Sequence, residues 1–428
     1  MIFLRVLFLF LVAFATPLVW SQTVQSICHT TPENQNEIIG THLDKRLPIA
    51  SVSKLVTSYW ALKALGPQFQ YSTGIYVQPL GSGQFDLHLR GSRDPYFGQE
   101  KLHYLISELN KRGLTQIRNM TFDENFLYLQ HLDIENDPLA DTAFERLANR
   151  WVWFNWYMHP TTIQRTLLEL NKGLLKDYEK TATKAQKNKI QFFKNPKLSV
   201  KNLNYIPSHE FTPQSGFLNF SVKSTQLIHL LKEMNRNSNN FAAVEIFNKA
   251  GGKDRFSQFI KKDLNLGSES ILFIEGSGNR VSERSQYNEA SCRALLKVFK
   301  ALDETLAGLK LNLHHVISVI GEEGLVDQGT NVSGDFTSRK GVAKTGTVDV
   351  SISLGGVLNS KPEKIYFMIN VKPKHPNARR PARNLVGAEI QKIAKKYSNS
   401  ISEFFYRDTD FISYDSSVEK ASISLQLK

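Results

Sequence analysis

Ser51 and Lys54 lie three residues apart at the start of a segment whose apolar residues have helical spacing. Three residues make nearly one helical turn, so the two side chains share one face of the predicted helix. Pro48 favours a chain entry just ahead of a helix, and Gly66-Pro67 ends the segment. A neutral lysine amine can take the proton of a serine hydroxyl. This stretch therefore predicts a helix whose first turn carries a nucleophile, where the helix end favours developing negative charge.

The same Ser-x-x-Lys spacing recurs at Ser417 and Lys420. This second copy lies in a polar C-terminal segment, and no apolar helical pattern follows it. An isolated match of this kind is usually an ordinary capped helix start. We therefore assign no catalytic role to the second copy.

Two further motifs follow the first along the chain. Ser238-Asn239-Asn240 lies on a tight connection between two apolar helical segments, and Lys344-Thr345-Gly346-Thr347 lies in a predicted strand. A second Ser-x-Asn, at Ser277-Gly278-Asn279, is surrounded by a glycine turn instead of a helix pair. We choose Ser238 and Asn240 as the candidate functional residues, and keep the later Ser-x-Asn copy as the alternative.

Residues 1–21 predict a secretory signal, with a charged start at Arg5, an apolar run to Trp20 and small residues at the cut. An uncleaved anchor is the alternative interpretation. Export indicates a periplasmic location and an oxidising compartment, in which Cys28 and Cys292 could form one disulfide or stay unpaired. Two cysteines are too few for a Cys₄ zinc site.

The net charge of +13 suggests an anionic envelope surface or polymer as the surroundings. Nucleic acid is a poor alternative because of the export signal and the lack of a basic-aromatic recognition pattern. Lysines recur through residues 172–201 at spacing typical of a solvated helix face. The aromatic cluster at 151–157 could contact a sugar polymer, but a core between domains is the favoured interpretation.

Periodicity outlines the remaining elements. The predicted helices cover residues 99–112, 224–234, 241–247, 287–302 and 381–396. A β-hairpin is expected over 71–89, a short strand at 271–274, and an antiparallel meander over 341–350, 351–358 and 364–371.

The three motifs, in this order, are those of penicillin-binding proteins and β-lactamases. Within that superfamily the chain resembles the D-alanyl-D-alanine carboxypeptidase/endopeptidase family of the penicillin-binding-protein-4 type, peptidase family S13. The closer resemblance rests on four stretches, at residues 48–54, 87–95, 234–240 and 343–347.

The resemblance implies an α/β (α+β) fold: a β-lactamase/transpeptidase-like domain with an antiparallel sheet and a helical subdomain, plus an inserted α+β domain between the first two motifs. The expected division is a discontinuous hydrolase domain at 22–68 and 222–396, an insertion at 69–221 and a C-terminal tail at 397–428. The long interval from Lys54 to Ser238 has room for a whole domain.

Residue chemistry and the resemblance together assign the roles at the first two motifs. Ser51 attacks a carbonyl, and Lys54 is the base, its pKa lowered by burial and by the neighbouring Lys344. Ser238 relays a proton toward the leaving amine, and Asn240 binds the amide of the acyl side.

The third motif holds the other end of the substrate. Lys344 and Thr345 are expected to bind its carboxylate, and Gly346 lets the strand backbone approach closely. The resemblance implies an oxyanion hole formed by the backbone N–H groups of Ser51 and Thr347. No metal or organic cofactor is needed.

The implied function is a serine-type D-Ala-D-Ala carboxypeptidase, a D,D-endopeptidase or both, acting on peptidoglycan stem peptides and inhibited by β-lactams. A β-lactamase is one alternative, which the long insertion disfavours. A catalytically inactive wall-binding protein is another, which the intact motifs disfavour. The chain has no His-Glu-x-x-His and no Gly-x-Ser-x-Gly, which argues against zinc peptidases and α/β-hydrolases.

Overall fold

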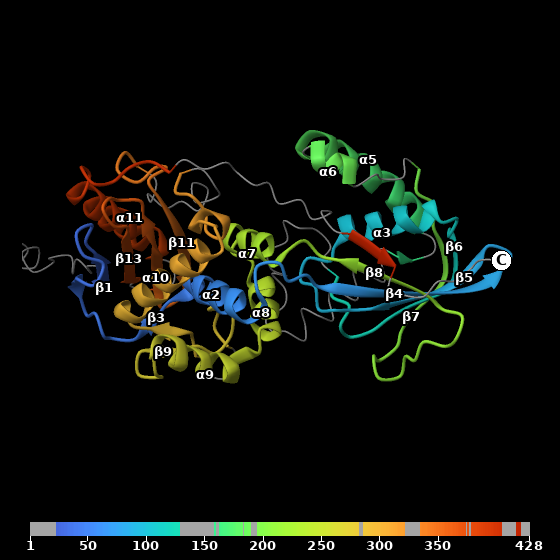
Figure 1. Ribbon diagram of the computed structural model, residues 1–428, viewed down its shortest axis with the longest axis horizontal. Helices are drawn as coiled ribbons and strands as arrows, with labels where there is room; N and C mark the ends of the chain where they lie inside the picture. The colour runs from blue at the N-terminus through green and yellow to red at the C-terminus, as the bar shows by residue number, and fades with distance from the viewer. Residues whose placement is uncertain are drawn as a thin grey trace, which may run out of the picture.

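The computed structural model describes residues 23–128, 158–159, 162–182, 184–189, 195–281, 286–321, 334–373, 375, 378–404 and 417–420. The predicted signal at 1–21 and the aromatic cluster at 151–157 lie outside these residues. Figure 1 shows two parts side by side, one built around β13 and α10 and the other around β4 and β5. No helix among the described residues is long and apolar enough to span a membrane.

The first part contains a five-stranded antiparallel sheet in the order β11-β12-β13-β1-β2. Its strands are β1 (Thr23–Thr30), β2 (Ile38–Thr41), β11 (Gly341–Val348), β12 (Ser351–Leu358) and β13 (Ile365–Lys372). The predicted meander is confirmed. The two N-terminal strands were not predicted, and β1 pairs with β13, so the first described strand lies inside the sheet.

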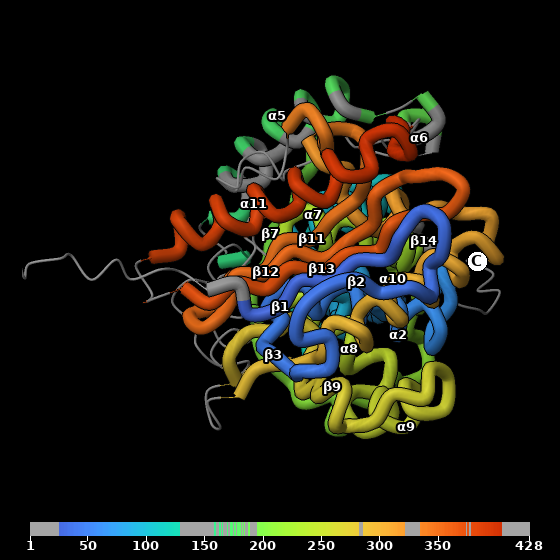
Figure 2. The backbone as a smooth tube through the Cα atoms, turned by 90° about the vertical axis from the view of Figure 1, so that its left-hand side faces the viewer, coloured from blue at the N-terminus to red at the C-terminus, as the bar shows by residue number. Residues whose placement is uncertain are grey.

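Both faces of this sheet are buried because apolar residues of β13 alternate between two cores. Tyr366 and Met368 belong to the core that contains α2 and α10, whereas Phe367 and Ile369 pack with α11. Figure 2 shows α11 along one side of the sheet and α10, α2 and α8 on the other. The helices of this part are α2 (Ser53–Leu65), α7 (Leu227–Arg236), α8 (Asn240–Lys249), α9 (Gly252–Leu264), α10 (Cys292–Gly308) and α11 (Arg379–Lys396).

The predicted start of one helix, at residue 287, was wrong. Glu289–Ala290 forms β10, the middle strand of a small sheet with β3 (Leu47–Pro48) and β9 (Ile271–Leu272). α10 begins only at Cys292, after the Ser291 hydroxyl accepts the N–H of Ala294. The Ser291 cap therefore sets the start of α10, and the backbone just before it pairs with β3 and β9 as strand β10.

Cys28 of β1 and Cys292 at the first turn of α10 form a disulfide, with their Cα atoms 6.1 Å apart. The sequence left this pairing open. The bond joins the sheet to the helix that covers it.

The second part is a six-stranded mixed sheet in the order β14-β8-β4-β5-β6-β7. The strands are β4 (Ser72–Gly81), β5 (Gln84–Arg90), β6 (Gln116–Phe122), β7 (Ser199–Tyr205), β8 (Leu218–Lys223) and β14 (Ser417–Lys420), and the helices are α3 (Gln99–Lys111), α5 (Ile163–Thr181) and α6 (Lys184–Lys189). The predicted hairpin is β4–β5, and α3 covers one sheet face with apolar residues such as Leu102, Leu105 and Leu109.

Residues of the lysine run lie on α5 and α6, where Lys172, Lys176, Lys180, Lys184 and Lys187 are exposed. This agrees with the predicted solvated helix face. The second Ser-x-x-Lys copy, at Ser417 and Lys420, forms strand β14 on β8 and does not start a helix. The tail thus docks on the second sheet, while the domain boundaries at 69–221 and 397–428 remain predictions.

His88 lies on the other face of this sheet and is buried under Phe211, with ring centroids 3.5 Å apart. Its Nδ1 is 2.9 Å from the Thr121 hydroxyl. Burial, with a smaller effect from Arg90, lowers the pKa of His88 to about 4.

Replacing both Cys28 and Cys292 by serine should lower the thermal midpoint of the oxidised protein. The disulfide closes a loop of 264 residues, and losing such a link costs on the order of 2–5 kcal/mol. Calorimetry of the double variant beside oxidised and reduced wild type measures the loss. Equal midpoints for all three would contradict the prediction.

Acid should destabilise the protein partly through His88. Its pKa of about 4 in the folded state lies below the usual 6.5, so its contribution is complete above pH 6.5 and is lost as pH falls toward 4. His88→Phe should reduce this loss by on the order of 1 kcal/mol. Urea unfolding between pH 8 and 4 tests this, with exposed His209→Gln as the control. Parallel pH curves for wild type and His88→Phe would refute it.

Candidate active site

Ser51 lies in a 3₁₀ turn, η1 (Ala50–Val52), directly before α2. The predicted helix is confirmed, but the serine belongs to the turn that leads into it. Ala50 has a φ of 46°, a left-handed conformation that residues other than glycine rarely adopt. Such a conformation persists only where the surroundings hold it.

Polar side chains of the large sheet hold the backbone ahead of this turn. The Ser351 hydroxyl donates to the carbonyl of Pro48 and the Ser353 hydroxyl to that of Ile49, each at 2.8 Å. The amide of Asn370 also donates to the Pro48 carbonyl, at 2.7 Å. Strands β12 and β13 therefore fix the position of the turn that presents Ser51.

Lys54 is fully buried at the first turn of α2, and its Nζ contacts three separate segments. It lies 3.1 Å from the Ser51 hydroxyl, 2.5 Å from Oδ1 of Asn240 and 3.1 Å from the carbonyl oxygen of Ser277. The structure thus brings the first two motifs together at one nitrogen.

These three contacts fit both protonation states of the lysine. An ammonium group donates one hydrogen to each partner. A neutral amine has two N–H groups, which satisfy Asn240 and Ser277, and its lone pair then faces Ser51. In that state the amine can accept the serine proton.

Ser238 lies in the short connection between α7 and α8, as predicted from the loop-forming residues, and Asn240 begins α8. Ser238 has a φ of 55°, and Asn239 caps α8 by accepting the N–H of Ala242 at 2.9 Å. Asn240 is the first residue of α8 and reaches Lys54. Ser238 is half-buried two residues earlier, and no hydrogen bond of its hydroxyl is found among the described residues.

The Lys-Thr-Gly motif lies on β11, the strand at one edge of the large sheet. A Cβ placed on Gly346 would lie only 2.9 Å from the backbone nitrogen of Ser51 and 2.9 Å from the Cβ of Ala50. Glycine therefore allows β11 to approach the serine turn. Lys344 and Thr345, both buried, immediately precede this contact, and Lys344 Nζ donates to the Thr345 carbonyl at 2.9 Å.

Comparison with known protein families decides the assignment. The model of the D-Ala-D-Ala carboxypeptidase 3 (S13) family matches residues 20–141 and 208–389, more than half of the chain. The chain belongs to the S13 family. It is a serine hydrolase that acts on D-Ala-D-Ala peptides.

Solved structures agree with this assignment. A predatory endopeptidase of Bdellovibrio bacteriovorus, Bd0816, in complex with the immunity protein Bd3460, is 26% identical with a TM-score of 0.79, over 93% of this chain and 100% of that chain. A second endopeptidase of that organism, Bd3459, acylated by penicillin G, is 26% identical with a TM-score of 0.74, over 92% and 97%. Penicillin-binding protein 4 of Haemophilus influenzae shares the fold, at 18% identity and a TM-score of 0.58 over 89% and 97%. No curated protein sequence gives a significant match.

The turn at residues 275–279, which contains the alternative Ser-x-Asn copy, also lies beside Lys54. Glu275 accepts hydrogen bonds from the N–H and the hydroxyl of Ser277, at 2.8 and 2.9 Å, and from the N–H of Gly278. Burial raises the pKa of Glu275, whereas its bonds to Ser277 and the charge of Lys54 act in the opposite direction. The turn orients the Ser277 carbonyl that Lys54 contacts.

Gly278 lets this turn pack against the backbone at Ala50, next to Ser51. Its φ is 83°, and a Cβ there would overlap the carbonyl oxygen of Ala50. The alternative Ser-x-Asn copy therefore contacts Lys54 through its backbone, while Asn240 of the first copy contacts Lys54 through its side chain. The glycine turn that argued against a role was in fact the signal of this close approach.

Arg383 of α11 was also missed. Its Nη2 lies 3.4 Å from the hydroxyl of Thr347, at the end of the Lys-Thr-Gly-Thr segment. The arginine places a cation beside the last residue of the Lys-Thr-Gly-Thr segment. Nothing in its helical sequence context distinguished it from the other basic residues of α11.

Gly346→Ala should slow acylation by a fluorescent penicillin by at least about 10²-fold, because the methyl group would push β11 away from the Ser51 nitrogen. Gly308→Ala, at the end of α10 with nothing within 4 Å, is the matched control. Stopped-flow or gel measurement of adduct formation gives the rates. Equal rates in both variants would show that this contact is not needed.

Proposed function

We propose that Ser51 is the nucleophile and Lys54 the general base of this S13 hydrolase. The observation that carries the proposal is the position of Lys54 Nζ, within hydrogen-bond distance of both Ser51 and Asn240. Ser51 Oγ forms the bond to the substrate carbonyl carbon as its proton passes to Lys54. The backbone N–H groups of Ser51 and Thr347 donate hydrogen bonds to the carbonyl oxygen as it becomes negatively charged.

The remaining motif residues complete the reaction. Ser238 passes a proton to the leaving amine as the peptide bond breaks, and Asn240 binds the amide of the acyl side. Lys344 and Thr345 hold the carboxylate of the leaving residue, with Arg383 as a second cation. Water then releases the acyl group from Ser51, so neither a metal ion nor an organic cofactor takes part.

We further propose that the substrates include cross-linked peptidoglycan peptides, so that the enzyme is an endopeptidase as well as a carboxypeptidase. The Bdellovibrio structures similar to this chain are named endopeptidases, and one is named a peptidoglycan endopeptidase. The alignment with Bd0816 spans the whole of that chain. β-Lactam inhibition is expected here because Bd3459 is acylated by penicillin G.

The proposed location is the periplasm, reached through cleavage of residues 1–21. The Cys28–Cys292 bond supports an oxidising compartment. The net charge of +13 supports association with an anionic envelope surface.

Ser51→Ala in the protein lacking residues 1–21 should abolish the penicillin adduct and lower hydrolysis of muropeptides by at least about 10³-fold. Ser417→Ala, in the second Ser-x-x-Lys copy, is the matched control and should behave as wild type. Gel fluorescence follows the adduct, and mass spectrometry identifies products from pentapeptide monomers and from cross-linked dimers.

Each alternative predicts a different result in these assays. A rapidly decaying wild-type adduct would indicate a β-lactamase, and the absence of both adduct and products would indicate an inactive wall-binding protein. Cleavage of pentapeptides without cleavage of dimers would restrict the enzyme to carboxypeptidase activity.

A further inference from the structure

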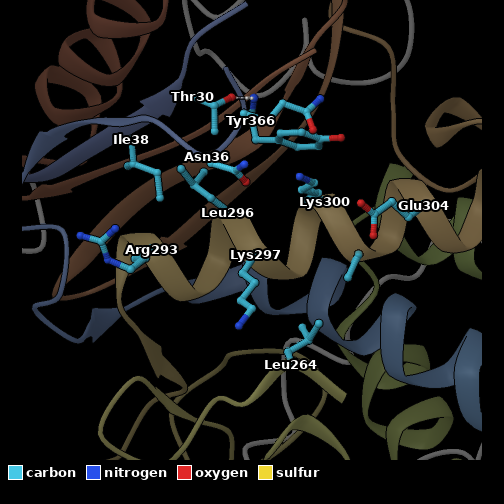
Figure 3. Close-up of a pocket in the computed structure, with 12 residues that line it drawn as sticks. Thr30, Asn36, Ile38, Leu264, Arg293, Leu296, Lys297, Lys300, Glu304 and Tyr366 are labelled. Atoms are coloured by element: carbon cyan, nitrogen blue, oxygen red, sulfur yellow. Dashed lines mark hydrogen bonds between the residues drawn. The ribbon is translucent and has the colours of Figure 1, made fainter. Parts of the chain in front are cut away.

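A cavity of about 390 Å³ lies between α10, the end of α9 and the strands β13, β1 and β2. Figure 3 shows that the lining residues lie along α10 and on either side of it. The volume is in the range of small-ligand sites. None of the residues assigned to catalysis lines it.

The cavity is separate from the active site. Its outermost strand, β2, and the Lys-Thr-Gly strand, β11, are the two edges of the five-stranded sheet. These edges are four strand spacings of about 4.8 Å apart, and even the nearest lining strand, β13, is two spacings, roughly 10 Å, from β11. A small ligand in the cavity therefore leaves Ser51 accessible.

Three cations of α10 line the cavity. Arg293, Lys297 and Lys300 are spaced by four and three residues, which places them on one face of the helix. Like charges at this spacing disfavour the helix slightly, so helix stability does not account for them. They create a positive surface over the cavity.

Among the described residues, two of these cations form no ion pair with a carboxylate. Arg293 pairs with Asp44 at 2.8 Å, but no ion pair joins Lys297 or Lys300 to a carboxylate in the described part of the chain. Asp303, beneath the cavity, is already engaged by Lys364 at 2.7 Å and by the Tyr366 hydroxyl. Glu304 is the one acidic residue of the lining.

The rest of the lining is apolar or neutral. Leu296, Leu264 and Ile38 contribute aliphatic surface, and Asn36 lies beside Leu296 in Figure 3. An amide can hydrogen-bond a peptide group, and the aliphatic residues suit short side chains such as methyl groups. A bare inorganic anion would use only the lysines, whereas a carboxylated peptide uses both kinds of surface.

We propose that this cavity is a second, non-catalytic binding site for a short peptide with free carboxylates. Lys297 and Lys300 bind the carboxylates, and Asn36 and the aliphatic residues contact the peptide. The ligand is the acidic stem peptide of the cell wall, an identity that rests on the proposed function. A second attachment point raises the effective concentration of the polymer at the enzyme.

The test measures binding of a stem tripeptide, L-Ala-γ-D-Glu-diaminopimelate, by calorimetry at low salt. Lys297→Glu/Lys300→Glu should weaken the wild-type affinity at least about tenfold, because both charge-assisted contacts become repulsive. Lys392→Glu/Lys395→Glu is the matched control, with the same charge change and spacing on exposed α11, and should leave affinity unchanged. Unaltered affinity in the first variant, or no binding by wild type, would overturn the proposal.

Two further arms separate the explanations. Inorganic phosphate binding as tightly as the tripeptide would reduce the cavity to a general anion site and refute the peptide assignment. Hydrolysis of a small soluble D-Ala-D-Ala peptide should be equal in wild type and both double variants, whereas release from intact wall should fall only in Lys297→Glu/Lys300→Glu. If no protein hydrolyses either substrate, the proposed function fails while the binding measurements still decide this inference.

Discussion

The contact of one buried amine with three chain segments is the interaction on which the rest of this structure depends. Lys54 has no exposed surface, so every hydrogen of its amine must be satisfied by protein. The partners are the Ser51 hydroxyl, the Asn240 side chain and the Ser277 carbonyl. A shift of α2, α8 or the glycine turn away from this nitrogen would leave a buried polar group unpaired, so the catalytic geometry and the packing of the core depend on each other.

Strained backbone at the site is held by the sheet. Ala50, next to Ser51, and Ser238, in the second motif, both have positive φ, at 46° and 55°. Each left-handed residue costs on the order of 1 kcal/mol, which must be offset by the surroundings. Around Ala50 the hydroxyls of Ser351 and Ser353 fix the preceding carbonyls. The antiparallel sheet thus supplies rigidity for a turn that would not adopt this shape alone.

Local patterns in the sequence correctly predicted the elements whose structure depends mainly on their own residues. α2, the loop between α7 and α8, and the β11–β13 meander follow from apolar spacing and from residues such as Asn239 that cap helices. The placement of β1 depends on pairing with β13, more than 330 residues later, and no local signal encodes that. The sequence predicted the turn at Ser277-Gly278 but not its contacts, because these join it to Ala50 and Lys54, which lie far away along the chain.

An ion pair with unequal burial joins the loop after β5 to α8. Arg93 donates two hydrogen bonds of 2.8 Å to Glu245, which is 5% exposed, while the arginine is 37% exposed. A buried carboxylate without its partner is costly, so the pair favours one arrangement of the two parts. Glu245 lies on the same helix as Asn240, which contacts Lys54. The ion pair therefore links the loop after β5 to α8, the helix whose Asn240 contacts Lys54.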